Sequence, residues 1–570
     1  MGENLRYVFS DVGIAILFCS LMLIIYLKQL KPYVALILLL TTGAGIYFVR
    51  TFQTEGYFAL TGDGLFMTSF VTKVMWSKFF GDYFYHGKPI IYPPGYFWLA
   101  GTYGRILGLS SMLTLKTFSG IAIMFTGICS FLIGKAILNE TYGLCMCFST
   151  LFLIPHSFIT DDFFFKPYTA LAGILIPYWV FQLASLNPRD MKQQLKSYFV
   201  GLLIIFFHYP FLALFGIPAA LVLFFLNRKK FFSKKLCLTY LIPIAVLLAI
   251  IFFAFCLPSS LSSEHETITT TLRASMVRML YTDPSYFTPT FMTLNIGNKS
   301  SLFVLTVFSY LFFRKRYIMK RLFFIPVIAG YLFYFGNLLL AQITNKITIG
   351  LSYLPLFISA ASIYPAAYFL SKGLLYLHRK FGKVPVAIMF LIVFLWGIYG
   401  KLGKLEWQEP YFRPLDRIAL EITKRNYPKD SVMLLSEGTY LKAIPAVLPV
   451  YLYLSPSESY SHPTISYPKR MEYLAKLSVT RNPEEFYSLA IGSPYGSIVV
   501  WGLKKESPNE IRFIFHKPVP GGICNWQYYD RSVLEDRRYF DKVYEDEISV
   551  LYLIKLEKAT ETLKIARGQD

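Results

Sequence analysis

One acidic residue, Asp63, stands in the polar stretch that follows the second apolar run of the chain, within Thr61-Gly62-Asp63-Gly64. A carboxylate held in a fixed place takes a proton from a hydroxyl group as that group attacks, so Asp63 is a candidate general base. The competing interpretation is that Asp63 caps the helix that follows it by accepting hydrogen bonds from the first turn. The two roles are compatible, because a cap also holds its carboxylate in place.

A basic and aromatic segment with the sequence KPIIYPPGY follows at residues 88–96. The two prolines fix their backbone angles and Gly95 permits a sharp turn. One interpretation is that Tyr92 and the following aromatic residues form a wall on which a sugar stacks, with Lys88 as a nearby cation. The other is a stiff turn that returns the chain to the bilayer.

Residues 64–80, between Asp63 and this segment, have an amphipathic pattern. Polar residues occupy positions 69, 72, 73 and 77, and apolar residues lie opposite them at 66, 70, 71, 74 and 75. This spacing predicts a helix that lies in the plane of the membrane interface.

A second acidic group, Asp161 and Asp162, lies between aromatic residues in the loop 156–167, which also carries Lys166. Two interpretations give the carboxylates a function: they bind a divalent metal ion, or they hold sugar hydroxyls. The alternative is a solvated acid pair beside a belt of aromatic anchors. No metal or other cofactor is required by the sequence.

Several cations lie on the side of the membrane where the positive-inside rule does not expect them. Lys and Arg bind phosphate, and Arg does so through a bidentate fork. These cations are Arg50, Lys88, Arg105, Lys166, Arg273 and Arg278, and the candidates for binding a substrate phosphate among them are Lys88, Lys166, Arg273 and Arg278. Contact with ordinary lipid headgroups is the competing interpretation for each. His208 is a further candidate contact to substrate, with a packing role as its alternative.

The elements that must position these residues are membrane spans. The chain has 570 residues, of which 55% are hydrophobic and only 16% charged. Long apolar runs recur through the first 400 residues, which indicates a polytopic α-helical membrane protein with about twelve spans. The expected spans are 12–27, 33–49, 117–137, 140–156, 168–185, 197–209, 211–226, 236–257, 300–313, 322–341, 351–371 and 384–400. The pair around His208-Tyr209-Pro210 is short, and we expect a re-entrant hairpin or two thin helices there.

The net charge of +22 does not indicate nucleic-acid binding, because the basic residues are concentrated in short connections between alternate spans. These connections are 28–31, 189–196, 228–235, 314–321 and 372–383. This is the positive-inside pattern, and it assigns them to the cytoplasm in contact with membrane lipid. The loop 50–116, the loop around Asp161 and everything after residue 400 then lie outside.

Beyond Gly400 the composition becomes that of a soluble domain, residues 401–570, with α/β or α+β content. An amphipathic helix is expected at 415–426, and strands at 431–436, 497–503, 511–515 and 548–554. The domain organisation is therefore a transmembrane part, 1–400, that carries the outer loop 50–116, followed by an extracytoplasmic domain.

Many spans, an acid in an early outer loop, an interfacial helix and a C-terminal extracytoplasmic domain together resemble a GT-C type glycosyltransferase. Within that class, the segment 91–98 (IYPPGYFW), with Gly62-Asp63-Gly64 before it, is similar to the galactan arabinofuranosyltransferases of actinobacterial cell walls, the AftA family. The segment from Tyr539 to Leu553 resembles the closing strand region of that family's C-terminal domain.

This resemblance implies an enzyme of the bacterial plasma membrane that works on its outer face. The implied donor is a polyprenyl-phosphate sugar, with a pentose such as arabinofuranose, and the implied acceptor is an envelope polysaccharide. It makes Asp63 the base of a direct, inverting displacement in which the lipid phosphate leaves.

Three other classes of protein were weighed. A polysaccharide ligase or polymerase typically carries long outer loops between late spans and lacks this C-terminal domain. A transporter or flippase for a lipid-linked saccharide is expected to have charges in its spans and internal repeats. A sensor would need a cytoplasmic signalling module. The sequence favours the enzyme, and the transporter or flippase is the main alternative.

Overall fold

The computed structural model describes a large part of the chain. The described residues are 31–53, 63–88, 90, 92–153, 167–185, 190–226, 245, 246, 249, 317–332, 336, 353–382, 384, 388, 432–434, 445, 446, 450–453, 467–493, 498–500, 503–505, 510–515, 525–545 and 549–555. The chain divides into two compact units, one of residues 1–54, 116–251 and 276–407, the other of residues 55–115, 252–275 and 408–570. The second unit thus combines the early loop with the C-terminal residues. The boundary near residue 400 stays a prediction.

The first unit is helical. Its described elements are α3 (Pro32–Gln53), α6 (Ser111–Ile137), α7 (Glu140–Phe148), η1 (Ser149–Leu153), α8 (Pro167–Ser185), α9 (Met191–Phe211), η2 (Leu212–Gly216), α10 (Ile217–Leu226), α17 (Tyr317–Met319), η4 (Lys320–Phe324), α19 (Tyr353–Ala361) and α20 (Ile363–Phe381). Among the described residues, three helical stretches are long and apolar enough to cross a membrane: 111–137, 167–185 and 191–226. Expected spans 12–27, 300–313 and most of 236–257 and 384–400 lie outside the described residues.

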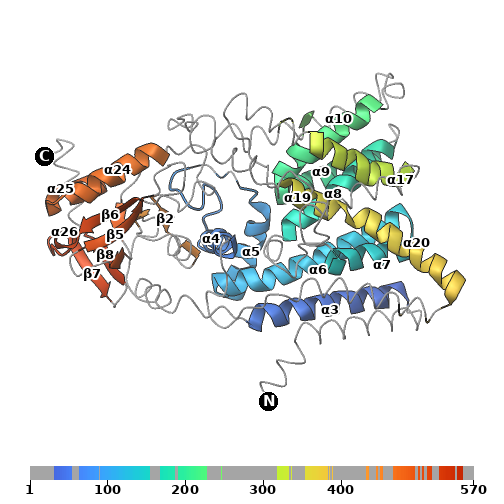
Figure 1. Ribbon diagram of the computed structural model, residues 1–570, viewed down its shortest axis with the longest axis horizontal. Helices are drawn as coiled ribbons and strands as arrows, with labels where there is room; N and C mark the ends of the chain where they lie inside the picture. Colours follow the sequence, from blue (N-terminus) through green and yellow to red (C-terminus); the bar gives the residue numbers. More distant parts are fainter. Residues whose placement is uncertain are drawn as a thin grey trace, which may run out of the picture. The chain divides into compact units, whose positions relative to one another are not determined.

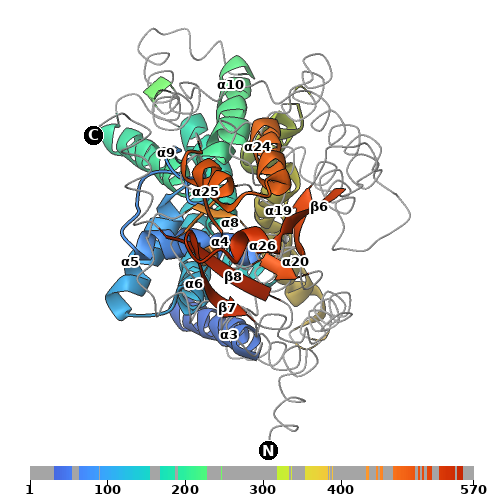
Figure 2. The same ribbon diagram turned by 90° about the vertical axis from the view of Figure 1, so that its left-hand side faces the viewer.

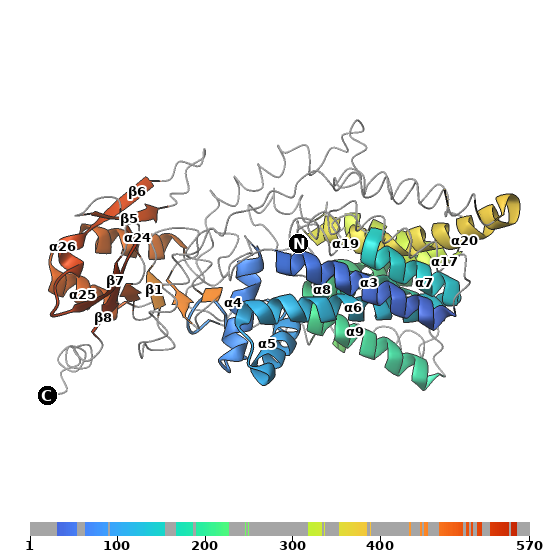
Figure 3. The same ribbon diagram turned by 90° about the horizontal axis from the view of Figure 1, so that it is seen from below.

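Helices α3, α6 and α7 lie side by side (Figure 3). The turn between α6 and α7 is capped by Asn139, whose side chain accepts a hydrogen bond of 2.9 Å from the Tyr142 amide. Gly134 and Gly143 let the two helices approach closely, since a Cβ added at Gly134 would lie 2.7 Å from the Gly143 Cα. Two buried tyrosines then connect α7, α20 and α8. The Tyr142 hydroxyl donates to the Tyr364 carbonyl, and the Tyr364 hydroxyl donates to the Ile174 carbonyl, at 3.0 and 2.6 Å.

The chain reverses direction at His208, within the long helical stretch 191–226. The backbone of His208 is not helical, with φ −160° and ψ 71°, and Pro210 follows it. Contacts with α8 show the reversal. Before the kink, Lys196 lies over Tyr178 and His208 stacks on Tyr168.

After the kink, the order along α8 runs the other way. An added Cβ at Gly173 would lie 3.5 Å from the Phe211 ring, and one at Gly216 would lie 3.5 Å from the Trp179 ring. From residue 196 to residue 208, the contacted residue of α8 changes from 178 to 168, so the two segments are antiparallel. From residue 211 to residue 216, it changes from 173 to 179, so these segments are parallel. This confirms the helical hairpin expected at His208-Tyr209-Pro210.

The second unit contains the helices α4 (Asp63–Met75) and α5 (Gly95–Leu107). They pack closely because α5 presents Gly101 to Val74 of α4. Helix α4 ends in a left-handed turn: Ser77 has φ 65°, and the Lys78 amide donates to the Lys73 carbonyl at 2.9 Å. This is the bonding of a Schellman motif, which usually places glycine at the left-handed position. The Ser77 side chain accepts a hydrogen bond from Arg105 of α5.

The C-terminal part of the same unit has two sheets. A parallel sheet has the order β2-β1-β3, from β1 (Val432–Leu434), β2 (Tyr451–Leu452) and β3 (Ile498–Val500). An antiparallel sheet has the order β6-β5-β4-β8-β7, from β4 (Leu503–Lys505), β5 (Glu510–Phe515), β6 (Asn525–Asp530), β7 (Phe540–Glu545) and β8 (Ser549–Ile554). Helix α24 (Tyr467–Val479) packs against β6, and α25 (Pro483–Ile491) against β3 (Figure 1).

The core of these C-terminal elements is aliphatic and aromatic. It includes Leu474 and Leu477 of α24, Phe486 and Tyr487 of α25, and Tyr552 of β8. Each of the four strands expected from the sequence overlaps an observed strand, β1, β3, β5 or β8. Four strands were missed. The helix expected at 415–426 lies outside the described residues.

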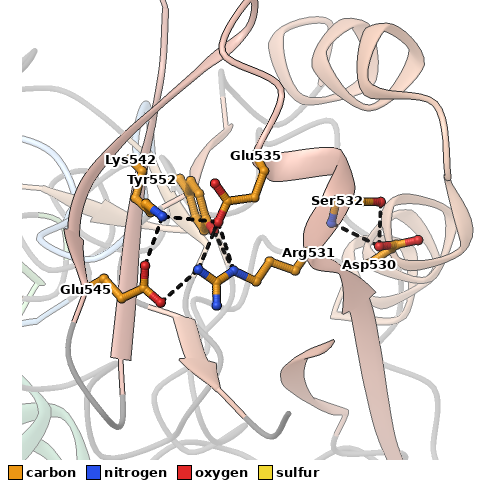
Figure 4. Close-up of polar contacts among 7 residues, drawn as sticks. All are labelled: Asp530, Arg531, Ser532, Glu535, Lys542, Glu545 and Tyr552. Atoms are coloured by element: carbon orange, nitrogen blue, oxygen red, sulfur yellow. Dashed lines mark hydrogen bonds and ion pairs between the residues drawn. The ribbon is translucent and has the colours of Figure 1, made fainter. Parts of the chain in front are cut away.

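The short helix α26 (Arg531–Leu534) lies beside the hairpin of β7 and β8 (Figure 2). A cluster of charged side chains joins the helix to the hairpin (Figure 4). Arg531 bonds to Glu535 at 2.9 Å, to Glu545 at 2.8 Å and to the Tyr552 hydroxyl at 3.2 Å. Burial opposes the charge of Arg531, but the bonds to Glu545 and Glu535 outweigh it, so the pKa of Arg531 is raised. Two cations and two carboxylates share the cluster, and we assign it a structural role.

Candidate functional site

The candidate general base, Asp63, is the first residue of α4. Its side chain is not among those that the structure describes. The rest of α4 differs from the sequence-based interpretation in one respect. The polar residues Ser69, Thr72 and Lys73, expected to face water at the membrane interface, are each 0% exposed. The amphipathic pattern identified the helix correctly, but it could not reveal that other protein segments cover the polar face.

The segment that covers Thr72 comes from the C-terminal part of the chain. The Thr72 hydroxyl donates a hydrogen bond of 2.6 Å to the carbonyl of Ala446. Next to it, the Lys73 ammonium lies 3.3 Å from the centre of the Tyr451 ring. A cation over the face of an aromatic ring is attracted by the ring quadrupole, and this attraction is strongest where water is excluded.

The loop between α4 and α5 is held in a compact turn. The Asp82 carboxylate accepts from the amides of Phe84 and Tyr85, at 2.8 and 2.7 Å. The Asp82 amide donates to the Lys88 carbonyl at 2.6 Å, which closes the turn. The backbone of Lys88 thus has a structural role, while its side chain is half-buried. Gly87, with φ 71°, supplies the left-handed conformation that the turn requires.

This turn is bound to strand β2. The Leu452 amide donates to the Phe84 carbonyl at 2.7 Å. The His86 ring meets the Tyr451 ring edge to face, with the ring centres 5.1 Å apart. The early loop is therefore joined to Ala446, Tyr451 and Leu452 through backbone and side chains alike.

Arg470 adds a further connection. It is 2% exposed, and its guanidinium donates to the Tyr453 carbonyl at 2.6 Å. The guanidinium carbon lies 5.4 Å from the centre of the Tyr85 ring and 5.3 Å from that of Tyr453. Arg470 thus lies between one ring from the early loop and one from the C-terminal segment.

Tyr92, the candidate for sugar stacking, belongs to an aromatic cluster. Its ring centre lies 5.7 Å from that of Phe66, 5.1 Å from Phe70 and 6.0 Å from Phe97. It is half-buried. The Pro-Pro-Gly turn that follows leads directly into α5, which begins at Gly95. The cluster packs α4 against α5, and the stiff-turn interpretation accounts for the prolines.

Nearby, burial raises the pKa of the Tyr83 phenol well above its usual value. Tyr83 therefore stays neutral, and its ring packs against Phe70 with the ring centres 4.5 Å apart. Its contribution to this site is packing rather than acid–base chemistry at neutral pH.

His208 lies in the first unit, at the turn of the hairpin. It is 1% exposed, its ring stacks on Tyr168 with the centres 6.0 Å apart, and its Nδ1 accepts from the Phe211 amide at 3.3 Å. Through its contact with Tyr168, His208 packs against the first turn of α8.

The remaining candidates, Asp161, Asp162, Lys166, Arg273 and Arg278, lie outside the described residues. Within the described part of the chain, no group of three His, Cys, Asp or Glu side chains is arranged to hold a metal ion. The proposals for these five residues therefore rest on the sequence alone.

The partners of α4 were not predicted from the sequence. Lys73 was predicted only to be a polar position of the helix, and no role was predicted for Tyr451 or Arg470. A signal existed for Arg470, because positions 470, 474 and 477 share one face of a helix and Leu474 and Leu477 are core residues. A cation on the apolar face of a helix indicates a buried interaction.

Comparisons with known family models and with curated protein sequences found no match. Solved structures do resemble the chain. One is ArnT from Cupriavidus metallidurans, solved bound to undecaprenyl phosphate, with a TM-score of 0.50 at 12% sequence identity. The match covers 90% of this chain and 97% of the ArnT chain. The oligosaccharyltransferase AglB from Archaeoglobus fulgidus, in complex with an inhibitory peptide and a dolichol-phosphate, has a TM-score of 0.44 at 12% identity, over 86% of this chain and 74% of its own.

The likeness to ArnT is one of fold. Together with the apolar helices, it supports a membrane protein with a GT-C type architecture, as the sequence predicts. It does not extend to the narrower resemblance to the AftA family.

Proposed function

We propose that this protein is a membrane glycosyltransferase that transfers a sugar from a polyprenyl-phosphate donor to an extracytoplasmic glycan. The observation that carries the proposal is the fold shared over nearly the full length of ArnT, a protein solved with undecaprenyl phosphate bound. The placement of Asp63 at the start of α4, in the early loop, agrees with it.

The proposed reaction is a direct displacement at the anomeric carbon of the donor. A hydroxyl of the acceptor attacks this carbon and loses its proton to the Asp63 carboxylate. The bond between the anomeric carbon and the phosphate oxygen breaks, and the polyprenyl phosphate leaves with its electron pair. One displacement inverts the anomeric configuration.

Cations of the outer loops are proposed to hold the leaving phosphate, because charge on its oxygens is stabilised by nearby Lys and Arg groups. These are Lys88, Lys166, Arg273 and Arg278. Tyr92 is proposed to contact the sugar, and Asp161 and Asp162 to accept hydrogen bonds from its hydroxyls or to bind a divalent metal ion. His208 is buried against Tyr168, so we assign it a packing role.

The finer proposal rests on the resemblance of the segments 62–64 and 91–98 to motifs of the AftA family. It specifies a pentose such as arabinofuranose, an envelope polysaccharide acceptor, and a site on the outer face of the bacterial plasma membrane. Twelve spans with an extracytoplasmic domain at 401–570 belong to the same proposal.

The test is a transfer assay with the full chain in detergent, a labelled polyprenyl-phosphate sugar and an envelope glycan, with and without a chelator. Asp63→Asn is expected to lower kcat by about 100-fold or more, since a positioned base contributes on that scale. Asp190→Asn is the matched control. Asp190 caps α9 by accepting from the Gln193 amide at 3.1 Å, and Asn is as good a cap as Asp.

Label on the glycan with wild type and Asp190→Asn, but not with Asp63→Asn, would support both the reaction and the base. Normal turnover by Asp63→Asn would remove that residue as the base. Tight binding of the lipid-linked sugar without transfer, across several sugars, would favour a flippase or transporter.

A further inference from the structure

Lys73 lies at the end of α4 opposite to Asp63, and it is surrounded by protein. Its side chain is 0% exposed, and its ammonium lies 3.3 Å from the centre of the Tyr451 ring. A lysine with no exposed surface does not bind a ligand from solvent in this arrangement. The contact it does make joins α4 to a segment nearly 400 residues later in the chain.

Two hydrogen bonds reinforce this contact on either side. The Thr72 hydroxyl donates to the Ala446 carbonyl at 2.6 Å, and the Leu452 amide donates to the Phe84 carbonyl at 2.7 Å. Ala446, Tyr451 and Leu452 thus contact the last turn of α4 and the turn that follows it. The other side of α4 is fixed by α5, through the close approach of Gly101 to Val74.

Asp63 and Lys73 belong to the same helix, so the contact that holds Lys73 also fixes the position of Asp63. Lys73 follows Asp63 by ten residues in α4. At about 1.5 Å per residue, the two positions are roughly 15 Å apart along the helix axis. If the helix tilted by about 5° about its anchored end, the other end would move by roughly 1.3 Å. Displacement of a reacting group by about 1 Å costs up to ~100-fold in rate.

We propose that Lys73 is a positioning residue for sugar transfer, which acts through its contact with Tyr451 to hold α4, and with it Asp63, in the productive place. This inference rests on the proposed function of Asp63. It also gives Ala446, Tyr451 and Leu452 a role in the reaction itself, because these residues hold the end of α4 and the turn that follows it.

The test combines steady-state kinetics with hydrogen exchange on the full chain in detergent. Lys73→Met keeps the length of the side chain and removes its charge. Tyr451→Leu removes the ring, whereas Tyr451→Phe keeps it and serves as the matched control. Lys73→Arg keeps a cation over the ring and is the conservative variant.

We expect Lys73→Met and Tyr451→Leu each to lower kcat by about 10- to 100-fold, with KM for the donor within about twofold of wild type. Tyr451→Phe and Lys73→Arg are expected to keep most of the wild-type kcat. The double variant Lys73→Met/Tyr451→Leu is expected to be no slower than the slower single variant, because either change alone removes the contact.

The second readout needs no substrate. Backbone amides of α4, residues 63–75, are expected to exchange faster with solvent deuterium in Lys73→Met and Tyr451→Leu than in wild type and Tyr451→Phe. If the wild-type protein transferred no sugar but the α4 amides exchanged faster in Lys73→Met and Tyr451→Leu, the proposed reaction would be refuted. The anchoring of α4 by Lys73 and Tyr451 would still be supported.

Three results would overturn the inference. The first is unchanged exchange in α4 in both variants, whether or not wild type is active. The second is a kcat close to that of wild type in Lys73→Met despite faster exchange. The third is a rise in KM alone, which would indicate that Lys73 contacts the donor directly.

Discussion

Replacing Gly101 by alanine tests how closely the position of α4 is controlled. Gly101 lies in α5 and faces α4. A Cβ added there would lie 2.5 Å from both the Cβ and the Cγ1 of Val74, and 3.2 Å from the Val71 carbonyl oxygen. Ordinary van der Waals contact begins at 3.4 Å, so the two helices must separate by 0.9 Å or more at this point. Rotation of the Val74 side chain moves Cγ1 but not Cβ, and therefore does not relieve the clash.

Two effects of Gly101→Ala follow from this separation. Overpacking of a close contact costs about 1–3 kcal/mol, so the thermal midpoint of the protein in detergent should fall by several degrees. A shift of α4 by about 1 Å should also lower kcat for transfer by roughly 10- to 100-fold, provided that Asp63 is the base. The assay is the labelled-donor reaction, measured at a temperature well below the midpoint of the variant.

Gly45→Ala is the control, since Gly45 lies in helix α3 and an added Cβ would meet nothing within 4 Å. This substitution should leave kcat unchanged, and it should maintain or raise the thermal midpoint because alanine is the better helix former. A Gly101→Ala variant with wild-type kcat and midpoint would refute the reasoning. Loss of stability with unchanged kcat would show that the reaction tolerates movement of α4.

The charged cluster at α26 gives two further predictions. Glu535 and Glu545 share two cations, Arg531 and Lys542. Arg531→Met should lower the free energy of unfolding by about 2 kcal/mol, because it removes the more buried of the two, whereas Lys542→Met should cost less than about 1 kcal/mol because that side chain is 39% exposed. Thermal midpoints of the two variants at one pH test the order. The hydroxyl of Ser532 donates to Asp530 at 2.7 Å and lowers the pKa of that carboxyl group below its usual value. A carboxyl group with a lowered folded-state pKa stabilises the protein above its unfolded pKa of about 3.9, and this stabilisation is lost as the pH falls through the folded-state pKa. Ser532→Ala should therefore be less stable than wild type at pH 7, and the difference should shrink below about pH 4. A difference that persists unchanged at low pH would mean that the hydroxyl acts through packing or capping instead.

The structure changes the interpretation of the early loop more than its boundaries. Its helix, its turn and its proline segment occur where the sequence places them, but they form one compact unit with the C-terminal residues. Four contacts join the early loop to the C-terminal residues: Thr72 with Ala446, Lys73 with Tyr451, Phe84 with Leu452, and Tyr85 with Arg470. A substitution far along the chain, such as Tyr451→Leu, therefore also tests the role of the early loop.

Local patterns in the sequence were sufficient for several features. Apolar runs of membrane-spanning length predict α8 and the end of α6, because a bilayer imposes a minimum length on each span. Proline after a histidine in a short apolar pair predicts the reversal at His208, since proline cannot continue the hydrogen bonding of a helix. The periodicity of residues 64–80 predicts α4. Strands with alternating or β-branched residues, β1, β3, β5 and β8, were found for the same reason.

Other features depend on which distant segments meet, and a linear pattern does not contain that information. Strands β2, β4, β6 and β7 are short or rich in polar residues, and they exist because neighbouring strands supply their hydrogen bonds. The polar face of α4 was expected to contact water, but Thr72 bonds to Ala446 and Lys73 lies over Tyr451. Residue type alone identified Asp63 as the candidate base and Lys73 as an ordinary polar position. Only the tertiary structure revealed that Lys73 meets Tyr451, because burying a cation requires a partner that the fold brings to it from far along the chain.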